Sequence, residues 1–202
     1  MMEKGQLVVI SGPSGAGKGT ICKAVLARTG MKGSVSVTTR PPRDGEQNGV
    51  DYNFISLEEY QQMIANGEFL ETAAVHQNYY GTPKKPVLEN LEKGYDVLFE
   101  VDVHGARSIK KKYPDAVLIF IMTKDFETLR QRLVDRNSET SDALKIRLSA
   151  ARHELEKYEM FDYIVINDEL ETAISQTLDI IAAEKCRIKN NVTVIKNILK
   201  AD

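Results

Sequence analysis

The feature that most constrains the fold is an apolar run that leads directly into a glycine-rich turn and then into a helical pattern. Residues 6–10 read QLVVI, and residues 12–18 read GPSGAGK. A short run rich in β-branched residues is typical of a buried strand. Apolar residues then recur at helical spacing over residues 18–29, so the beginning of the chain predicts a strand, a tight loop and a helix.

The same alternation continues along the chain. Further apolar runs occupy residues 96–103, 116–122 and 163–166. Helical patterns separate or follow them at residues 86–93, 104–113, 125–136, 142–159 and 170–189. Continuous apolar strands that alternate with helices indicate a parallel sheet covered on both faces, which is the α/β class.

Composition limits the kinds of partner. The chain has 202 residues, 27 basic and 29 acidic, so its net charge is −2. This length fits one domain of moderate size, and the near-neutral charge argues against nucleic acid or a membrane surface as a partner. Two cysteines are too few for a disulfide framework, and residues 1–6 lack the apolar stretch of a secretory leader. A cytoplasmic location is therefore expected.

The glycine-rich turn has the pattern of a phosphate-binding loop (P-loop). The pattern G-x-x-x-x-G-K is matched by Gly12, Pro13, Ser14, Gly15, Ala16, Gly17 and Lys18. Its glycines allow backbone N–H groups to converge on a phosphate, the helix that follows adds its positive end, and the lysine reaches the β- and γ-phosphates. The usual Ser or Thr after the lysine is replaced by Gly19, with Thr20 next. Thr20 is a candidate for the α- and β-phosphates and for Mg²⁺, which it would contact directly or through water.

Residues 34–85 interrupt the α/β alternation and are expected to form a small subdomain. They contain β-like pieces, a short helix at residues 57–66 and several turn signals. Arg40 and Arg43 flank a Pro-Pro kink, and two arginines so placed can converge on one phosphate. Tyr52 and Tyr80 can add hydroxyl donors. The alternative is a solvated loop around a tyrosine core.

Seven motifs occur in a known order. They are GPSGAGK, TTRPPR, DYNF, GEFLE, NYYGT, RLSAA and VINDEL. In this order they resemble the guanylate kinases, P-loop enzymes of the nucleoside monophosphate kinase family. The resemblance implies a P-loop kinase fold with a central parallel sheet, whose catalytic domain spans residues 5–185. Within it lie a GMP-binding insert at 34–85 and a helical lid at 124–148, and a C-terminal tail follows at 186–202.

The resemblance also implies the reaction and the acceptor site. An ATP:GMP phosphotransferase converts GMP and ATP to GDP and ADP, in purine nucleotide metabolism and GMP recycling. The residues implied for the GMP phosphate are Ser36, Arg40, Arg43 and Tyr80, with Tyr52 beside them. Those implied for guanine are Glu71, Asp102 and Thr82, with Thr82 standing where the family often has Ser. The chemistry is consistent, because guanine presents adjacent N–H donors and a carboxylate is an acceptor-only fork.

Two carboxylates compete for a metal role. Asp102 ends an apolar strand, as the Mg²⁺-anchoring acid of many P-loop proteins does. Glu100 lies two residues earlier on the same face. From the resemblance we assign Asp102 to guanine and keep Glu100, with Thr20, as the candidates for the shell of the Mg²⁺ that accompanies ATP.

The lid implied by the resemblance carries arginines that close over the triphosphate. Arg132 and Arg136 are four residues apart and share a helical face, and Arg147 follows on the next helix. Together with Lys18 they are the expected catalytic residues. The alternative is an ion-paired amphipathic hairpin, and Arg130 and Arg152 are expected to lie on the surface. Asn167 follows a predicted strand, and the resemblance implies contact with adenine.

Two other functions stay open at this point. One is a kinase for a different nucleoside monophosphate, against which Glu71 and Thr82 argue. The other is a guanylate-kinase-like module that binds partners without catalysis, against which the intact P-loop argues. The expected partners are ATP and GMP, with no nucleic acid or membrane, in a monomer or a homodimer.

Overall fold

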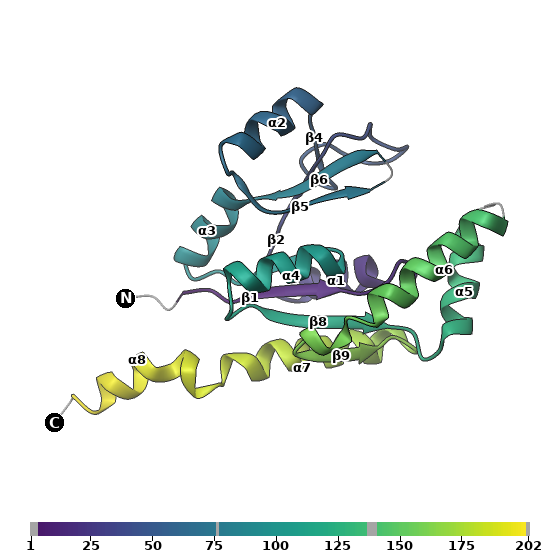
Figure 1. The fold of residues 1–202 in the computed structure, drawn as a ribbon. Helices are drawn as coiled ribbons and strands as arrows, with labels where there is room; N and C mark the ends of the chain where they lie inside the picture. Colours follow the sequence, from purple (N-terminus) through teal and green to yellow (C-terminus); the bar gives the residue numbers. More distant parts are fainter. Residues whose placement is uncertain (1–3, 76, 137–140, 201–202) are drawn as a thin grey trace.

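The structure is a computed structural model that describes residues 4–75, 77–136 and 141–200; at residues 75, 135, 136 and 141–143 only the backbone is described. A sheet covered by helices forms the body of the molecule (Figure 1). A smaller sheet with its own helix lies on one side of this body. A pair of helices, separate from the smaller sheet, projects from another side of the body (Figure 1). The predicted α/β class is confirmed.

The central sheet contains five parallel strands. In spatial order they are β2 (Lys32–Gly33), β7 (Val97–Glu100), β1 (Leu7–Ser11), β8 (Val117–Met122) and β9 (Tyr163–Ile166). The strand before the P-loop, β1, is therefore the middle strand, and all five of its residues are buried. The carboxyl ends of these parallel strands meet at one edge of the sheet, which is where such folds bind their ligands.

Alternate residues of β1 supply two separate cores. Val8 and Ile10 pack in the core with α1 (Lys18–Arg28) and α7 (Leu170–Lys185). Leu7 and Val9 face the other way, into a core with α3 (Lys84–Glu92) and α4 (Val103–Lys112). The strand period of two explains the division, and each half of the apolar run stabilises one helical layer.

The insert folds as a second sheet. Its strands, in spatial order, are β4 (Asn53–Phe54), β3 (Val37–Thr38), β6 (Asn78–Pro83) and β5 (Phe69–Val75). The helix α2 (Leu57–Ala65) packs on it through Tyr60. Lys112 joins this sheet to the body, because its ammonium group donates to the carbonyl of Leu70 at 2.5 Å.

The lid region is a helical hairpin. It consists of α5 (Phe126–Arg136) and α6 (Ser141–Leu155), and the short 3₁₀ helix η1 (Tyr158–Met160) follows. Leu129 and Leu133 are buried in a third core with Ala151. The hairpin lies at the carboxyl edge of the central sheet, beside the P-loop (Figure 1).

Several predicted boundaries differ from the structure; the helix predicted at residues 142–159, for example, ends at Leu155, and two other differences have a clear local description. The predicted strand at residues 96–103 ends at Glu100, because the Asp102 carboxylate caps α4 by accepting from the Gly105 N–H at 2.7 Å. The predicted helix at residues 170–189 breaks at Cys186, and α8 (Ile188–Ile198) begins two residues later. This last helix extends away from the body (Figure 1). Within the described chain, no helix is both long and apolar enough to cross a membrane.

Candidate active site

The P-loop joins β1 to α1 and has the backbone that a phosphate cradle needs. Gly12 has φ 140°, and a Cβ there would lie 2.1 Å from the carbonyl oxygen of Ile121. Gly17 has φ 95°, and its Cβ would lie 2.3 Å from the side-chain nitrogen of Asn167. Only glycine fits at either position, so these glycines are required by conformation and by close packing.

Lys18 begins α1 and turns back over the loop. Its ammonium group donates to the carbonyl oxygens of Gly12 at 2.6 Å and Pro13 at 3.1 Å. Burial lowers the pKa of Lys18, and the negative charges of Glu100 and Glu154 oppose this shift. The two backbone carbonyls thus hold the Lys18 amine against the loop.

Asn167 supports the loop from β9. Its side chain is 4% exposed and donates to the Ala16 carbonyl at 2.8 Å. Its own backbone carbonyl accepts from the Arg132 guanidinium at 3.0 Å. Asn167 therefore connects the P-loop to a lid arginine, a role that the sequence alone did not predict.

The lid arginines that can be located face the P-loop. Arg132 of α5 lies beside Asn167, and Arg147 of α6 donates to the Ser14 hydroxyl at 3.4 Å. Arg136 ends α5, and its side chain is outside the described residues. Arg130 instead pairs with Glu127 at 3.1 Å, and Arg152 stacks on Phe126, as expected for surface side chains.

A phosphate-sized group of donors forms in the insert. The Arg40 guanidinium is 5.2 Å from the centre of the Tyr52 ring, whose centre is 5.9 Å from that of Tyr80. Arg40 is 8% exposed, and its guanidinium also interacts with the Tyr80 side chain. The Arg43 side chain is exposed three residues further on. The structure therefore brings Arg40, Tyr52 and Tyr80 together.

A second polar group lies where the insert meets α4. The Thr82 hydroxyl donates to Glu71 Oε1 at 2.6 Å, and the Ser36 hydroxyl lies 3.1 Å from that of Thr82. A Cβ on Gly105 would lie 3.2 Å from Glu71 Oε2 and 3.4 Å from Asp102 Oδ1, so both carboxylates border this glycine. Ser36, which the resemblance grouped with the phosphate ligands, sits in this group because β3 pairs with β6.

The electrostatics of this second group favour a ligand with hydrogen-bond donors. Glu71 is 5% exposed, and burial raises the pKa of its carboxyl. The Thr82 hydrogen bond lowers this pKa, whereas the nearby Asp102 raises it. Buried acceptors that lack enough donors are costly. Guanine N1–H and N2–H₂ are donors of the required kind.

The Glu100 carboxylate borders Gly19, as the predicted Mg²⁺ role of Glu100 requires. A Cβ at this position would lie 3.3 Å from Glu100 Oε2, so the carboxylate reaches the space that a Ser or Thr side chain would fill. Thr20 and Glu100 are both exposed toward solvent. Among the residues that the structure describes, no three His, Cys, Asp or Glu side chains form a metal cluster.

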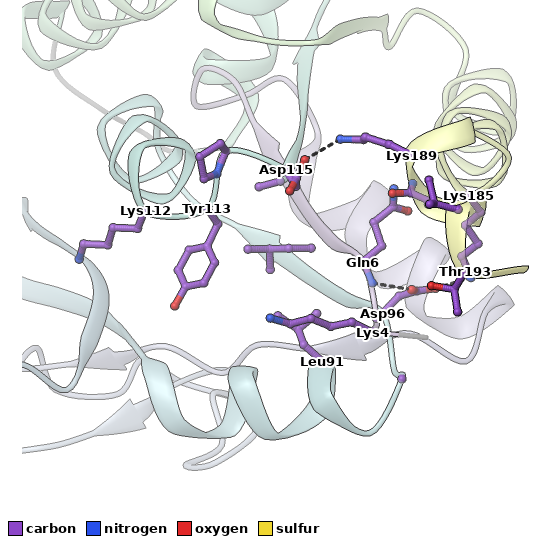
Figure 2. A pocket seen from close by; sticks show the side chains of 17 residues that line it. Lys4, Gln6, Leu91, Asp96, Lys112, Tyr113, Asp115, Lys185, Lys189 and Thr193 are labelled. Carbon is purple, nitrogen blue, oxygen red and sulfur yellow. Dashed lines mark hydrogen bonds and ion pairs between the residues drawn. The ribbon is translucent and has the colours of Figure 1, made fainter. Parts of the chain in front are cut away.

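A pocket of about 730 Å³ lies at the opposite edge of the sheet. It is lined by the residues that precede β1, β7 and β8, together with parts of α4, α7 and α8 (Figure 2). Two ion pairs lie in it: Lys189 contacts Asp115 at 2.9 Å, and Lys185 contacts Asp96. Because parallel sheets bind nucleotides at their carboxyl edge, this pocket is not the nucleotide site.

The fold and the P-loop define a phosphotransferase of the P-loop kinase class. The guanylate kinase family model matches residues 4–184. A guanylate kinase of Clostridium tetani is 46% identical over 187 residues, which are 93% of this chain and 90% of that protein. A guanylate kinase of Clostridium perfringens is 48% identical over 186 residues, 92% of this chain and 86% of that protein.

A solved structure agrees with these sequences. The crystal structure of guanylate kinase from Anaplasma phagocytophilum has a TM-score of 0.77 and 32% identity, and the match covers 93% of this chain and 89% of that one. The chain described here belongs to the guanylate kinase family.

Proposed function

We propose that this chain transfers the γ-phosphoryl group of ATP to GMP, which yields ADP and GDP. ATP would lie on the P-loop under the lid, and GMP would lie between the insert and α4. The observation that carries the choice of acceptor is the buried Glu71 carboxylate, held by Thr82 at 2.6 Å and bordered by Asp102. In adenine, N1 is an acceptor without a hydrogen and would face the acceptor oxygens of this carboxylate. Guanine instead presents its N1–H and N2–H₂ donors.

The roles of the other acceptor residues follow from their grouping. Arg40, Tyr52 and Tyr80 would hold the GMP phosphate, and Arg43 would reach it from the same loop. Ser36 and Thr82 would meet the O6 edge of guanine. Because Thr82 donates its one hydroxyl proton to Glu71, the Ser36 hydroxyl donates to Thr82 in their 3.1 Å contact, and one of the two hydroxyls would have to turn to donate to O6.

The transfer itself needs positioning and charge more than covalent chemistry. An oxygen of the GMP phosphate attacks the γ-phosphorus, and the bond to the β,γ-bridging oxygen of ATP breaks with ADP as the leaving group. Lys18 would stabilise the negative charge on the β- and γ-phosphates, and Arg132, Arg136 and Arg147 would stabilise the equatorial oxygens. Asn167 would keep the P-loop and Arg132 in register, and contact with adenine remains a prediction.

Mg²⁺ would be held on the Glu100 and Thr20 side of the P-loop. When bound, it neutralises charge on the β- and γ-phosphates. The insert at residues 34–85 and the lid at 124–148 would close over the substrates and exclude water, which suppresses ATP hydrolysis. A cytoplasmic location and a monomeric or homodimeric state also remain predictions.

A coupled ADP-release assay with GMP, AMP, UMP and CMP tests the acceptor. We expect turnover with GMP that exceeds turnover with AMP by at least about 10⁴-fold in kcat/KM. Equal turnover of AMP and GMP would overturn the assignment of Glu71. Lys18→Met should abolish nearly all turnover while the protein stays folded by circular dichroism, and unchanged turnover would refute the role of the P-loop.

A further inference from the structure

Glu46 forms a two-point contact with the arginine at the centre of the acceptor site. Arg40 NH1 donates to Glu46 Oε2 at 2.7 Å, and Arg40 NH2 donates to Glu46 Oε1 at 2.6 Å. The side chains of Arg40 and Glu46 are 9% and 20% exposed. Such a parallel pair of charged hydrogen bonds fixes the direction as well as the distance of both groups.

The remaining donors of Arg40 can be counted. A guanidinium has five N–H donors in a fixed plane. Glu46 takes one from NH1 and one from NH2, and the Pro41 carbonyl accepts from NH1 at 2.9 Å. Those three bonds leave the second hydrogen of NH2 and the hydrogen of Nε for the Tyr80 side chain, which also interacts with the guanidinium, and for a ligand. These two hydrogens lie on the same side edge of the guanidinium, which is itself a fork suited to two phosphate oxygens.

The plane of the guanidinium is fixed as well. Its central carbon lies 5.2 Å from the centre of the Tyr52 ring and 5.6 Å from that of the Phe54 ring. Stacking limits tilt, and the carboxylate limits rotation within the plane. Arg40 is therefore held in one orientation, in which the edge formed by Nε and NH2 points away from Glu46.

The same carboxylate also organises the loop that carries the second arginine. Glu46 Oε2 accepts from the Arg43 backbone N–H at 2.8 Å, and the Glu46 N–H donates to the Arg43 carbonyl at 3.0 Å. The hydrogen bonds from Arg40 and Arg43 lower the pKa of Glu46 to about 2, so it is ionised at neutral pH. One ionised side chain thus holds both the Arg40 guanidinium and the Arg43 backbone.

We infer that Glu46 is a positioning residue that orients Arg40, and through the loop Arg43, toward the phosphate of the acceptor nucleotide. The inference rests on the proposed function, which assigns Arg40 to that phosphate. Preorganisation of this kind improves binding because the ordering cost is met before the ligand arrives. Glu46 and the phosphate are both negatively charged, so Glu46 could instead compete with the phosphate for Arg40. Removing a competitor would tighten GMP binding, whereas removing a positioning residue would weaken it. The direction of the change in GMP affinity therefore separates the two roles.

The test compares Glu46→Ala and Glu46→Gln with Asp44→Asn, an exposed acid in the same loop. Calorimetry measures the affinity for GMP, and inhibition of turnover measures the affinity for guanosine, which lacks the phosphate. We expect Glu46→Ala to weaken GMP binding about 10- to 100-fold, because charged hydrogen bonds are lost and Arg40 becomes mobile. Glu46→Gln keeps one acceptor oxygen and should show a smaller loss. Guanosine affinity, the KM for ATP and the Asp44→Asn variant should stay within about twofold of the wild type.

Three results would overturn the inference. GMP affinity that is unchanged or tighter in both Glu46 variants would show that Glu46 does not position Arg40. An equal loss of GMP and guanosine affinity would show a general disturbance of the insert, and Glu46→Gln allows this comparison if Glu46→Ala does not fold. Arg40→Ala separates this inference from the proposed function: if it leaves GMP affinity unchanged, the phosphate site itself is wrongly assigned.

Discussion

Glu71 is the buried side chain on which the proposed choice of base depends most directly. Its carboxylate is 5% exposed, and it accepts a hydrogen bond from Thr82 at 2.6 Å. Burial opposes the charged form, and a ligand with two N–H donors would stabilise it. Burial of the Glu71 carboxylate is therefore unfavourable in the free protein, and a ligand with two N–H donors would offset this cost.

Replacing Glu71 by Gln should separate activity from stability. We expect kcat/KM for GMP to fall about 10²-fold or more, because one acceptor becomes an amide donor that opposes guanine. The KM for ATP should not change. The free energy of unfolding at neutral pH should not decrease, because the substitution removes a buried charge. Steady-state kinetics and urea unfolding measure these quantities. Glu68→Gln, an exposed acid before β5, is the matched control, and an equal loss in this variant would contradict the assignment.

The acceptor site should also respond to pH. The pKa of Glu71 lies above its ordinary value of 4.5, so its carboxyl takes up a proton at a higher pH than a typical glutamate does. As the pH falls through this raised pKa, the carboxylate becomes a weaker acceptor and the KM for GMP should rise. The linkage sign for folding is opposite: the folded protein binds this proton more tightly, so stability from this group decreases as the pH rises from about 4.5 through the raised pKa.

A pH profile of kcat/KM for GMP at saturating ATP measures this effect. The inflection assigned to Glu71 should be absent from the profile of Glu71→Gln. Persistence of the same inflection in that variant would assign it to another group.

At the level of elements, the P-loop and the lid are joined through β9. Asn167 follows that strand, holds the Ala16 carbonyl at 2.8 Å and accepts from Arg132 at 3.0 Å. The loop, the strand end and α5 are thus one connected unit. Nucleotide positioning should depend on this unit even where its members do not touch the nucleotide.

Asn167→Ala should therefore impair both folding stability and ATP binding. The change leaves the buried Ala16 carbonyl without its side-chain donor, which costs about 1–3 kcal/mol of unfolding free energy. We expect the KM for ATP to rise several-fold while the KM for GMP stays nearly constant. Unfolding in urea and steady-state kinetics measure the two effects. Asp168→Ala, which removes only an exposed ion pair with Lys124, should change neither.

Two arginines that are two residues apart on α5, and so point to different sides of the helix, offer a matched comparison. Arg132 faces the P-loop, whereas Arg130 pairs with Glu127 at the surface. Arg132→Ala should lower kcat by about 10²- to 10³-fold, because it removes a donor from the transferring phosphoryl group. Arg130→Ala should remain within about twofold of the wild type. Similar losses in both variants would indicate damage to the helix and contradict a specific role for Arg132.

At the scale of the whole molecule, features formed by consecutive residues can be predicted from the sequence, whereas contacts between distant residues cannot. The central strands are predictable because each is a continuous apolar run, and the P-loop is predictable because its glycines are adjacent in sequence. The grouping of Ser36 with Thr82 depends on how β3 pairs with β6, and the support of Ala16 by Asn167 joins residues 151 positions apart. Single-sequence patterns do not contain such pairings.

The C-terminal tail has an apolar pattern that is consistent with the helix found there. Its apolar residues at 188, 192 and 195 have helical spacing, and the structure places them on α8. None of the residues of α8 is buried, so its helical pattern could not be supported by packing against a recognisable core. The Asn190 and Asn191 side chains meanwhile donate to the carbonyls of Glu184 and Lys185, at 2.7 and 2.8 Å, and so cap the end of α7.

This arrangement predicts that the two parts of the tail contribute differently to the molecule. A chain that ends after Asn191 keeps both capping amides, and its unfolding free energy should match the full-length value within about 0.5 kcal/mol, because the rest of α8 is exposed. A chain that ends after Cys186 loses both amides and should be less stable by about 1 kcal/mol. Both should keep the full kcat and both KM values, since the family match ends at residue 184. Urea unfolding and the ADP-release assay measure these quantities. A loss of turnover in the chain that ends after Cys186 would contradict the prediction. It would mean that the active protein needs α8, for example as a contact between two copies of the chain.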